Sequence, residues 1–324
     1  MAGTITHFYF AKDVATKIKK ERDISLDWDL LYIFAQSMDP FHFYNLFLPF
    51  LSDGIKKRGF SEIFHTQKTD DFFKELIRHI KHKNLYKDIY VRTFLYGLIT
   101  HYVLDSSIHP YVEYKCGSFN PKDKNTYKYN AKHHEMETFL DTYMLKCDGK
   151  DPKSYKSYKI LFNIDNINDT LIKVMDFVFK KVYKLDNFSK YYIKAIKDMK
   201  YSFRIFRYDP WGIKLVAYKT FDIISPKKIL NSAFLSYNFK TNNEEKFLNN
   251  KKESWLYPAN EKMILNYSFD DIYKNSINKC VDIIYKIDDY FKYGRRIDYR
   301  KLFSLSYVYG IDWKIKVEKK IYEF

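Results

Sequence analysis

Two segments of the chain place a histidine four residues before a carboxylate. His101 precedes Asp105, and His133 precedes Glu137. A spacing of four residues puts both side chains on one face of an α-helix. Imidazole nitrogens and carboxylate oxygens are ligands that suit zinc or a similar cation acting as a Lewis acid. Helical bundles build two-metal sites from pairs of this kind, so the spacing predicts a multinuclear metal site.

The first pair lies in a segment that is apolar on nearly every face. An aspartate in such a helix must be paired or coordinated, because an isolated buried carboxylate costs several kcal/mol. A divalent metal ion would satisfy Asp105. His109 follows after four more residues, and Pro110 predicts that the helix ends there. We therefore expect His109 to face the same pocket from the end of the helix.

The second pair borders an apolar helix face, and Asp141 extends its polar row by another four residues. A single histidine–carboxylate pair is more often a satisfied core histidine or an exposed pair on a helix surface. Two such pairs, 32 residues apart and joined by His109, favour a shared site. His134 lies about 100° from His133 around the helix and is predicted to point away from the site.

Three residues nearer the N-terminus are further candidates, namely His7, Asp39 and His65. Each has a simpler interpretation when taken alone. The two histidines have apolar neighbours, as buried structural histidines do, and an aspartate before Pro40 is typical of a turn.

The histidines are confined to one part of the chain, because all nine lie within the first 134 residues. This segregation favours a metal site assembled by the first half. We therefore divide the chain into a metal-binding catalytic half, 1–150, and a helical half, 151–324, that completes the same domain. His79 and His82 lie in a basic stretch and are predicted to be solvent-exposed.

The elements that must position these residues are predicted to be helices, which makes the protein all-α. Strand-like alternation is almost absent, and 9 glycines and 8 prolines are few for 324 residues. Polar loops are expected at 117–130, 148–158 and 240–262. Residues 169–185 carry apolar side chains at helical spacing, and a further helix is expected to begin at Ser268 with Asp271 completing a capping box.

Composition indicates the cellular compartment that we expect for the protein and the kinds of partner it could bind. The three cysteines are far apart and form no CxxC pair, and the first 20 residues do not resemble an export signal. We expect a cytoplasmic protein. The net charge of +16 is uneven, with 22 Lys and Arg against 19 Asp and Glu in 1–150, and 34 against 21 in 151–324. A basic surface of this kind attracts anionic membrane or nucleic acid, although an AT-rich coding sequence would also enrich lysine.

The candidate residues occur in motifs that resemble the bacterial zinc-dependent phospholipase C family, whose helical fold and three-zinc site are shared with fungal single-strand zinc nucleases. The motifs are THFYFA, SMDPFHFY, the lone His65, HYVLDSSIHPY and HHEMETFLD. The resemblance implies an all-α bundle and three ligand groups. One zinc would be held by Asp39, His65, His101 and Asp105, a second by His109, His133 and Glu137, and a third by His7, with Asp105 bridging two metals.

The chain departs from this family in two places. Secreted members supply the backbone of an N-terminal tryptophan to the third zinc, whereas this chain begins MAGTITH. The step from Asp105 to His109 is also shorter than in those enzymes. We therefore expect two or three zinc ions per chain.

The predicted function is zinc-dependent hydrolysis of a phosphodiester, phospholipase C-like, by a metal-activated water. The resemblance also implies that Asp39 is the catalytic general base. The substrate is expected to be a phosphoester, with a lipid headgroup as one candidate, and the basic half would then contact anionic membrane. A single-strand nuclease, less favoured because the first half is nearly neutral, and a non-catalytic metal-stabilised binding protein remain the alternatives.

Overall fold

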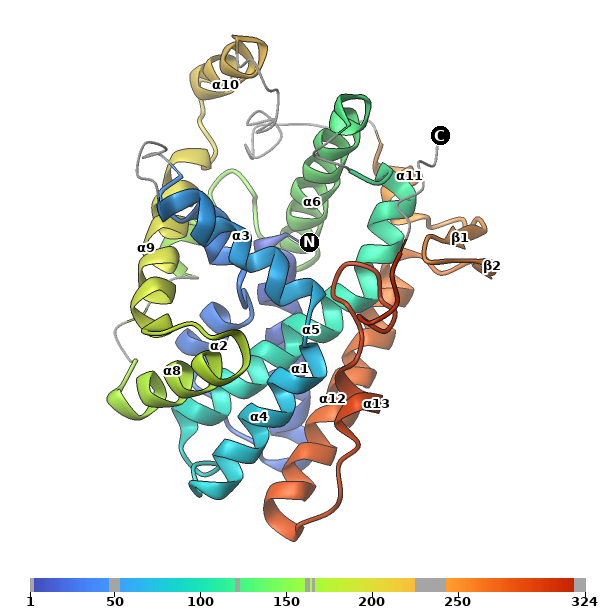
Figure 1. Cartoon of the computed structure of the whole chain (residues 1–324). Coiled ribbons are helices and arrows are strands. Elements are labelled where there is room, and N and C mark those ends of the chain that lie inside the picture. The colour runs from blue at the N-terminus through green and yellow to red at the C-terminus, as the bar shows by residue number, and fades with distance from the viewer. Residues whose placement is uncertain are drawn as a thin grey trace.

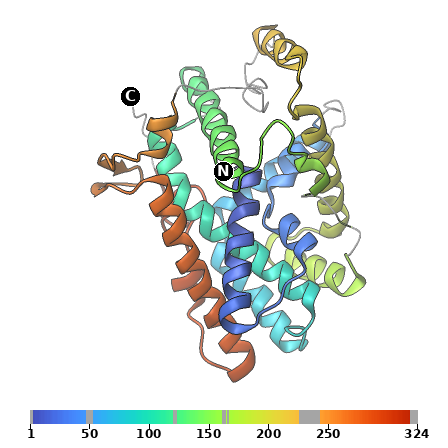
Figure 2. The same ribbon diagram turned by 180° about the vertical axis from the view of Figure 1, so that it is seen from behind.

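The computed structural model describes residues 3–46, 53–119, 123–160, 164, 167–224 and 243–317. Within these ranges the protein is a bundle of α-helices with one two-stranded sheet (Figures 1 and 2). The all-α prediction is confirmed. No helix among the described residues is both long enough and apolar enough to cross a membrane.

The helix α5 (Ile89–Cys116) runs through the middle of the bundle. It is buried along nearly its whole length, which its apolar residues on every face explain. Asp88 caps its first turn by accepting hydrogen bonds from the backbone N–H groups of Tyr90 and Val91. The helices that pack directly against it include α1 (Thr4–Arg22), α2 (Trp28–Phe34), α6 (Tyr127–Cys147) and α12 (Phe269–Tyr293). This central helix is the frame on which the other elements meet.

The remaining elements surround this core. They are η1 (Asp39–Phe43), α3 (Asp53–Thr66), α4 (Thr69–His82), η2 (Lys124–Thr126), α7 (Ser157–Ile160), α8 (Asp169–Tyr183), α9 (Phe188–Phe206), α10 (Ile213–Ile224), α11 (Glu244–Leu248), β1 (Trp255–Tyr257), β2 (Asn260–Leu265) and α13 (Tyr299–Phe303). The helix predicted at 169–185 corresponds to α8. The capping box predicted at the start of α12 is present, since Ser268 and Asp271 each accept a hydrogen bond from the other's backbone N–H.

A glycine allows α2 and α5 to approach each other closely. A Cβ added to Gly97 would lie 2.5 Å from the Cβ of Phe34 and 3.3 Å from the backbone nitrogen of Ala35. No larger residue fits at that distance. The crossing brings the end of α2 to the part of α5 that lies one turn before His101.

The prediction that the helix ends at Pro110 is wrong, because α5 continues to Cys116. A proline inside a helix leaves the carbonyl four residues earlier without its helical donor. That carbonyl belongs to Ser106, and Gly310 packs against it from the C-terminal part of the chain. A Cβ on Gly310 would lie 2.6 Å from the Ser106 oxygen and 2.9 Å from the Cγ of Pro110. The local irregularity is thus filled by a distant segment.

The polar loop predicted at 240–262 is also wrong within the described residues. Residues 243–262 contain α11, all of β1 and the start of β2, which pairs with β1 as an antiparallel hairpin. Trp255 is buried, with its ring 5.3 Å from that of Tyr111 on α5, and this packing holds the hairpin against the bundle. The loop expected at 117–130 is shorter than predicted, because α6 begins at Tyr127, and residues 120–122 lie outside the described ranges.

Candidate metal centre

Six of the predicted site residues converge on the middle of α5 from four different elements. They are His7 on α1, Asp39 on η1, His65 on α3, and His101, Asp105 and His109 on α5 itself. All six are buried. Helix spacing explains only the three from α5, which lie four residues apart, and packing of the other elements supplies the rest.

The carboxylate of Asp105 is at the centre of this group. Its Oδ1 lies 3.2 Å from the Nε2 of His7 and 4.0 Å from the Nε2 of His109. Its Oδ2 lies 3.1 Å from the Nε2 of His101 and 4.0 Å from the Nε2 of His65. Four imidazoles therefore present the same ring atom to one fully buried carboxylate. Such a carboxylate is placed to contact more than one cation.

A second carboxylate, that of Asp39, completes one side of the cluster. Its Oδ1 lies 3.4 Å from the Nε2 of His65 and 3.9 Å from the Nε2 of His101, and the two Nε2 atoms are 3.1 Å apart. The ligand atoms of these three residues all lie within 4.8 Å of one another, as do those of His7, His101 and Asp105. Both groups are compact enough to hold a metal ion.

Three of the imidazoles are oriented by backbone carbonyls. The Nδ1 of His65 lies 2.6 Å from the carbonyl oxygen of Ser61, and that of His101 lies 2.8 Å from the oxygen of Ala35. The Nδ1 of His109 lies 2.8 Å from the oxygen of Tyr307. A carbonyl only accepts, so each Nδ1 carries a proton, and in the neutral rings of His65 and His109 the Nε2 presents a lone pair to the centre. Metal-binding histidines are held in this way.

Several buried polar atoms of the cluster have no hydrogen-bond partner among the described residues. The Nε2 atoms of His7 and His109 and the Oδ1 of Asp39 form no hydrogen bond with a described residue. Leaving a buried polar atom unsatisfied costs about 1–3 kcal/mol. Coordination of a cation would satisfy all three atoms, and their chemistry, imidazole and carboxylate, is that of zinc ligands. The residues present therefore fit the metal.

Burial keeps three histidines of the cluster in the neutral form that binds metals, whereas at His101 burial is outweighed by the nearby carboxylates, chiefly Asp105, which raise its pKa. Burial lowers the pKa of His7 to about 4 and that of His109 to about 3. It also holds the pKa of His65 well below the usual range. These three rings are neutral at pH 7 without a proton having to leave them.

The two carboxylates of the cluster differ in charge state. Burial raises the pKa of Asp39 to about 8. Burial also opposes ionisation of Asp105, but His109, His101 and His7 outweigh it and hold the pKa of Asp105 well below its usual range. Asp105 therefore carries the negative charge of the cluster at pH 7. Asp39 would become ionised when a cation binds beside it, because a nearby positive charge lowers the pKa of a carboxyl group.

The second predicted pair lies beside the first group. The Nε2 of His133 is 3.1 Å from the Oε1 of Glu137, and the centres of the His133 and His109 rings are 5.9 Å apart. His134 also contacts Glu137, with its Nδ1 3.2 Å from Oε2, so the prediction that it points away from the site is wrong. The reason is that residues three apart on a helix are neighbours as well as residues four apart.

Asp141, which extends the row of His133 and Glu137, has a structural role. Its Oδ1 accepts hydrogen bonds from the backbone N–H and the hydroxyl of Thr6, at 2.8 and 2.9 Å. Gly3 packs so closely that a Cβ there would lie 2.2 Å from the same oxygen. The carboxylate therefore caps the start of α1 from another helix and positions His7, one residue after Thr6.

The sequence did not indicate that the C-terminal segment 304–317 takes part in the site. The carbonyl of Tyr307 accepts from His109, 198 residues earlier in the chain, and its N–H donates to the carbonyl of His65 at 2.9 Å. Its ring meets that of His65 edge-on, with centres 4.9 Å apart. Because the polar contacts are made by backbone atoms, no residue type in the sequence could have revealed them.

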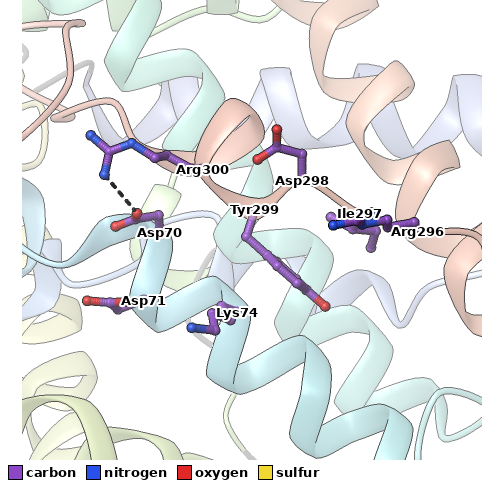
Figure 3. Close-up of a pocket in the computed structure, with 8 residues that line it drawn as sticks. All are labelled: Asp70, Asp71, Lys74, Arg296, Ile297, Asp298, Tyr299 and Arg300. Carbon is purple, nitrogen blue, oxygen red and sulfur yellow. Dashed lines mark ion pairs between the residues drawn. The ribbon is translucent and has the colours of Figure 1, made fainter.

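Residues that line a surface pocket contact this segment (Figure 3). The pocket has a volume of about 560 Å³ and is lined by Asp70, Asp71, Lys74, Arg296, Ile297, Asp298, Tyr299 and Arg300. Asp70 accepts a hydrogen bond from the indole N–H of Trp313 at 2.7 Å and lies 3.8 Å from Arg300. None of the predicted site residues lines it. The pocket's charged groups join the start of α4 to the C-terminal segment.

The histidines predicted to be solvent-exposed differ from each other. His82 is exposed, whereas His79 is half-buried and stacks on the ring of Phe177, with centres 4.0 Å apart. Phe177 is exposed on the surface of α8 and packs there against His79. Neither histidine reaches the cluster around Asp105.

One comparison with known proteins found a match. A family model described as zinc-dependent phospholipase C matches residues 6–189. No curated protein and no solved structure matches the chain. The matched range includes all eight predicted ligands, from His7 to Glu137, and ends before α10, the hairpin and the C-terminal segment.

Proposed function

Because the chain belongs to the zinc-dependent phospholipase C family, we propose that it hydrolyses the phosphodiester bond of a lipid headgroup at the cluster around Asp105. One observation carries the proposal. The imidazoles of His65, His101 and His109 are each fixed through Nδ1, so their Nε2 atoms face the buried carboxylate. This is the arrangement of a preformed metal site.

We assign the ligands as the family resemblance implies. Asp39, His65, His101 and Asp105 would hold one zinc ion, and His109, His133 and Glu137 a second. His7 would contribute to a third, with Asp105 shared between two ions. The distances around Asp105 support this division, because its Oδ2 lies on the side of His101 and His65 while its Oδ1 lies on the side of His7 and His109.

The donor set favours catalysis over a purely structural metal. A structural zinc is usually enclosed by four protein ligands, often cysteines, whereas a catalytic zinc keeps a position for water. Here the candidate donors are imidazoles and carboxylates, and all three cysteines are free thiols. When bound, zinc ions would lower the pKa of a water to about 7 and polarise the phosphoryl oxygens. The protein then needs no covalent nucleophile.

Asp39 is the residue we assign as general base. Its Oδ1 forms no hydrogen bond with a described residue, so it has a lone pair available for a proton. It also keeps a small exposed fraction, whereas His101 and Asp105 are fully enclosed. In this role the carboxylate of Asp39, with one lone pair directed at the zinc, would take the proton of the attacking water through another lone pair.

The test is hydrolysis of a soluble chromogenic phosphodiester together with the zinc content of the purified protein. We expect two or three zinc ions per chain, and loss of turnover with a chelator that returns when zinc is restored. Asp39→Asn should lower turnover by at least about 100-fold, which is typical of a lost general base. His82→Gln, an exposed histidine on α4 outside the cluster, is the control and should keep both zinc and turnover.

Each alternative predicts a different result. Cleavage of single-stranded nucleic acid with a steep salt dependence, and no action on phospholipid, would assign the nuclease function instead. Zinc binding without hydrolysis of any phosphodiester would assign a metal-stabilised binding protein. Fewer than two zinc ions per chain at saturation would overturn the ligand assignment itself.

A further inference from the structure

Helix α10 carries an apolar stripe that no described residue covers. Ile213, Val216 and Ile223 are 69%, 65% and 76% exposed, and Trp211, just before the helix, is 85% exposed. With 3.6 residues per turn, the three aliphatic side chains fall within an arc of about 80°. Single exposed apolar residues are common on protein surfaces, but a stripe that follows one helix face marks a binding surface.

The opposite face of α10 is attached to the end of α9, and this attachment sets the direction of the stripe. Lys214 Nζ and the Tyr218 hydroxyl both donate to the carbonyl of Ile205, at 3.1 and 2.9 Å. The carboxylate of Asp209 accepts from the backbone N–H of Lys214 at 2.9 Å. With Lys214 and Tyr218 held against α9, the apolar stripe faces away from the bundle.

Basic residues lie on α9, the helix to which α10 is attached, and one more lies beside the stripe. Residues 190–220 contain eight Lys and Arg against two Asp. Lys190, Lys197 and Arg204 on α9 are exposed, and their seven-residue spacing puts them within about 40° of one another. None of the three forms an ion pair with a described residue. Lys219 is exposed beside the apolar stripe. We call Lys190, Lys197 and Arg204 the basic face of α9.

The position of α10 relates this surface to the metal centre. Figures 1 and 2 show that α10 extends from the bundle at the same end of the molecule as one tip of α6, the helix that carries His133 and Glu137. A flat partner that meets α10 would therefore also approach that end of the bundle.

We propose that α10, with the basic face of α9, docks the protein peripherally on a bilayer that contains anionic phospholipid. The aliphatic stripe and Trp211 would enter the boundary between headgroups and acyl chains, where tryptophan is favoured. The cations would contact the anionic headgroups. The positive charge of the chain favours an anionic membrane over a second copy of the same chain, because two copies of this strongly basic chain would repel each other. The inference rests on the proposed function only for its purpose, which is to deliver lipid phosphodiesters to the site.

The experiment is sedimentation of the full chain with vesicles, using phosphatidylcholine alone and an equimolar mixture of phosphatidylcholine and phosphatidylserine. The test variant combines Trp211→Ala with Ile213→Ser, Val216→Ser and Ile223→Ser. The control combines Met263→Ser, Ile264→Ser and Ile315→Ser, which removes exposed apolar side chains elsewhere. We expect wild type and control to prefer the anionic vesicles, and the α10 variant to bind them at least about tenfold more weakly.

Three results would overturn the proposal. Wild type could fail to bind anionic vesicles, the α10 variant could bind them as wild type does, or the variant could lose only self-association in sedimentation-velocity measurements, which would assign the stripe to a second copy. Circular dichroism checks that the variant is folded.

Turnover of the soluble chromogenic phosphodiester separates this proposal from the proposed function. Vesicle binding through α10 by a chain that hydrolyses neither soluble nor lipid phosphodiesters would leave the docking intact and remove the function. If the chain hydrolyses the soluble phosphodiester but the α10 substitutions leave its vesicle binding unchanged, the proposed function stands and the docking proposal falls.

Discussion

The close approach of α2 and α5 at Gly97 should control the affinity for zinc. In Gly97→Ala the new Cβ would lie 2.5 Å from the Cβ of Phe34, whereas carbon atoms in contact are usually about 3.5–4.0 Å apart. The end of α2 must therefore move away by about 1 Å. That end includes Ala35, whose carbonyl oxygen holds His101 Nδ1 at 2.8 Å. A shift of this size would break the hydrogen bond that orients His101.

The expected magnitudes differ for stability and for metal binding. Overpacking a well-packed core costs about 1–3 kcal/mol, and replacing glycine with alanine inside a helix returns about 1 kcal/mol. The free energy of unfolding of the metal-free protein should therefore fall by only about 0–2 kcal/mol. Loss of a hydrogen bond behind a metal ligand typically weakens metal binding by about 10–100-fold. Gly97→Ala should thus impair zinc binding far more than folding.

The assay is competition with a chromophoric chelator for zinc, combined with denaturant unfolding of the metal-free protein. Gly59→Ala is the matched control, because Gly59 is an exposed residue of α3 and an added Cβ would have no neighbour within 4 Å. The control should gain about 1 kcal/mol of stability and keep its zinc affinity. Wild-type zinc affinity in Gly97→Ala, in a folded protein, would refute the reasoning about Ala35 and His101.

Two further predictions concern the C-terminal segment and pH. In Gly310→Ala the new Cβ would lie 2.2 Å from the Tyr257 hydroxyl at a backbone φ of 63°, so the segment should shift and release His109 from the Tyr307 carbonyl. We expect at least about tenfold weaker zinc binding in chelator competition, and unchanged binding would contradict the role of the segment. For the metal-free protein, the pKa values of His7 and His109, about 4 and about 3, lie below the value of about 6.5 in an unfolded chain. Between pH 6.5 and 4 the unfolded state binds more protons at each of these histidines, so each should lower the free energy of unfolding by about 2 kcal/mol at pH 5, whereas Asp39 and Asp141, whose pKa values are raised to about 8 and about 7, contribute in the opposite direction. Denaturant unfolding of the wild type and of His109→Gln at pH 7 and pH 5 would test this, because the variant should lose about 2 kcal/mol less between the two pH values, and an equal loss in both proteins would contradict the burial of the His109 ring.

Local patterns in the sequence were sufficient for the helical architecture and for part of the site. The four-residue steps from His101 to Asp105 and His109 place these side chains on one face, because the geometry of a helix is the same wherever it occurs. The capping box at Ser268 was predictable for the same reason. His7, Asp39 and His65 were identified only through the family resemblance, since each has a simpler interpretation when taken alone. The eight-residue ligand assignment, the division at residue 150 and the cytoplasmic location stay predictions.

The errors arose where distant segments replace local contacts. Pro110 was expected to end its helix, but the helix continues, and the segment around Gly310 packs at the carbonyl that the proline leaves without a donor. Asp141 extends a row of site residues, yet its carboxylate is used to cap α1. Sequence spacing describes which side chains share a face. It does not describe which other element that face will meet.

The sequence by itself determined that helices would form and that imidazoles and carboxylates would border an apolar core. Only the tertiary structure decided that four elements would bring those groups together around Asp105, and that Ser61, Ala35 and Tyr307 would orient the rings. The physical reason is that every residue has the same backbone carbonyl. Its use as a partner depends on where the chain passes, not on which amino acid carries it.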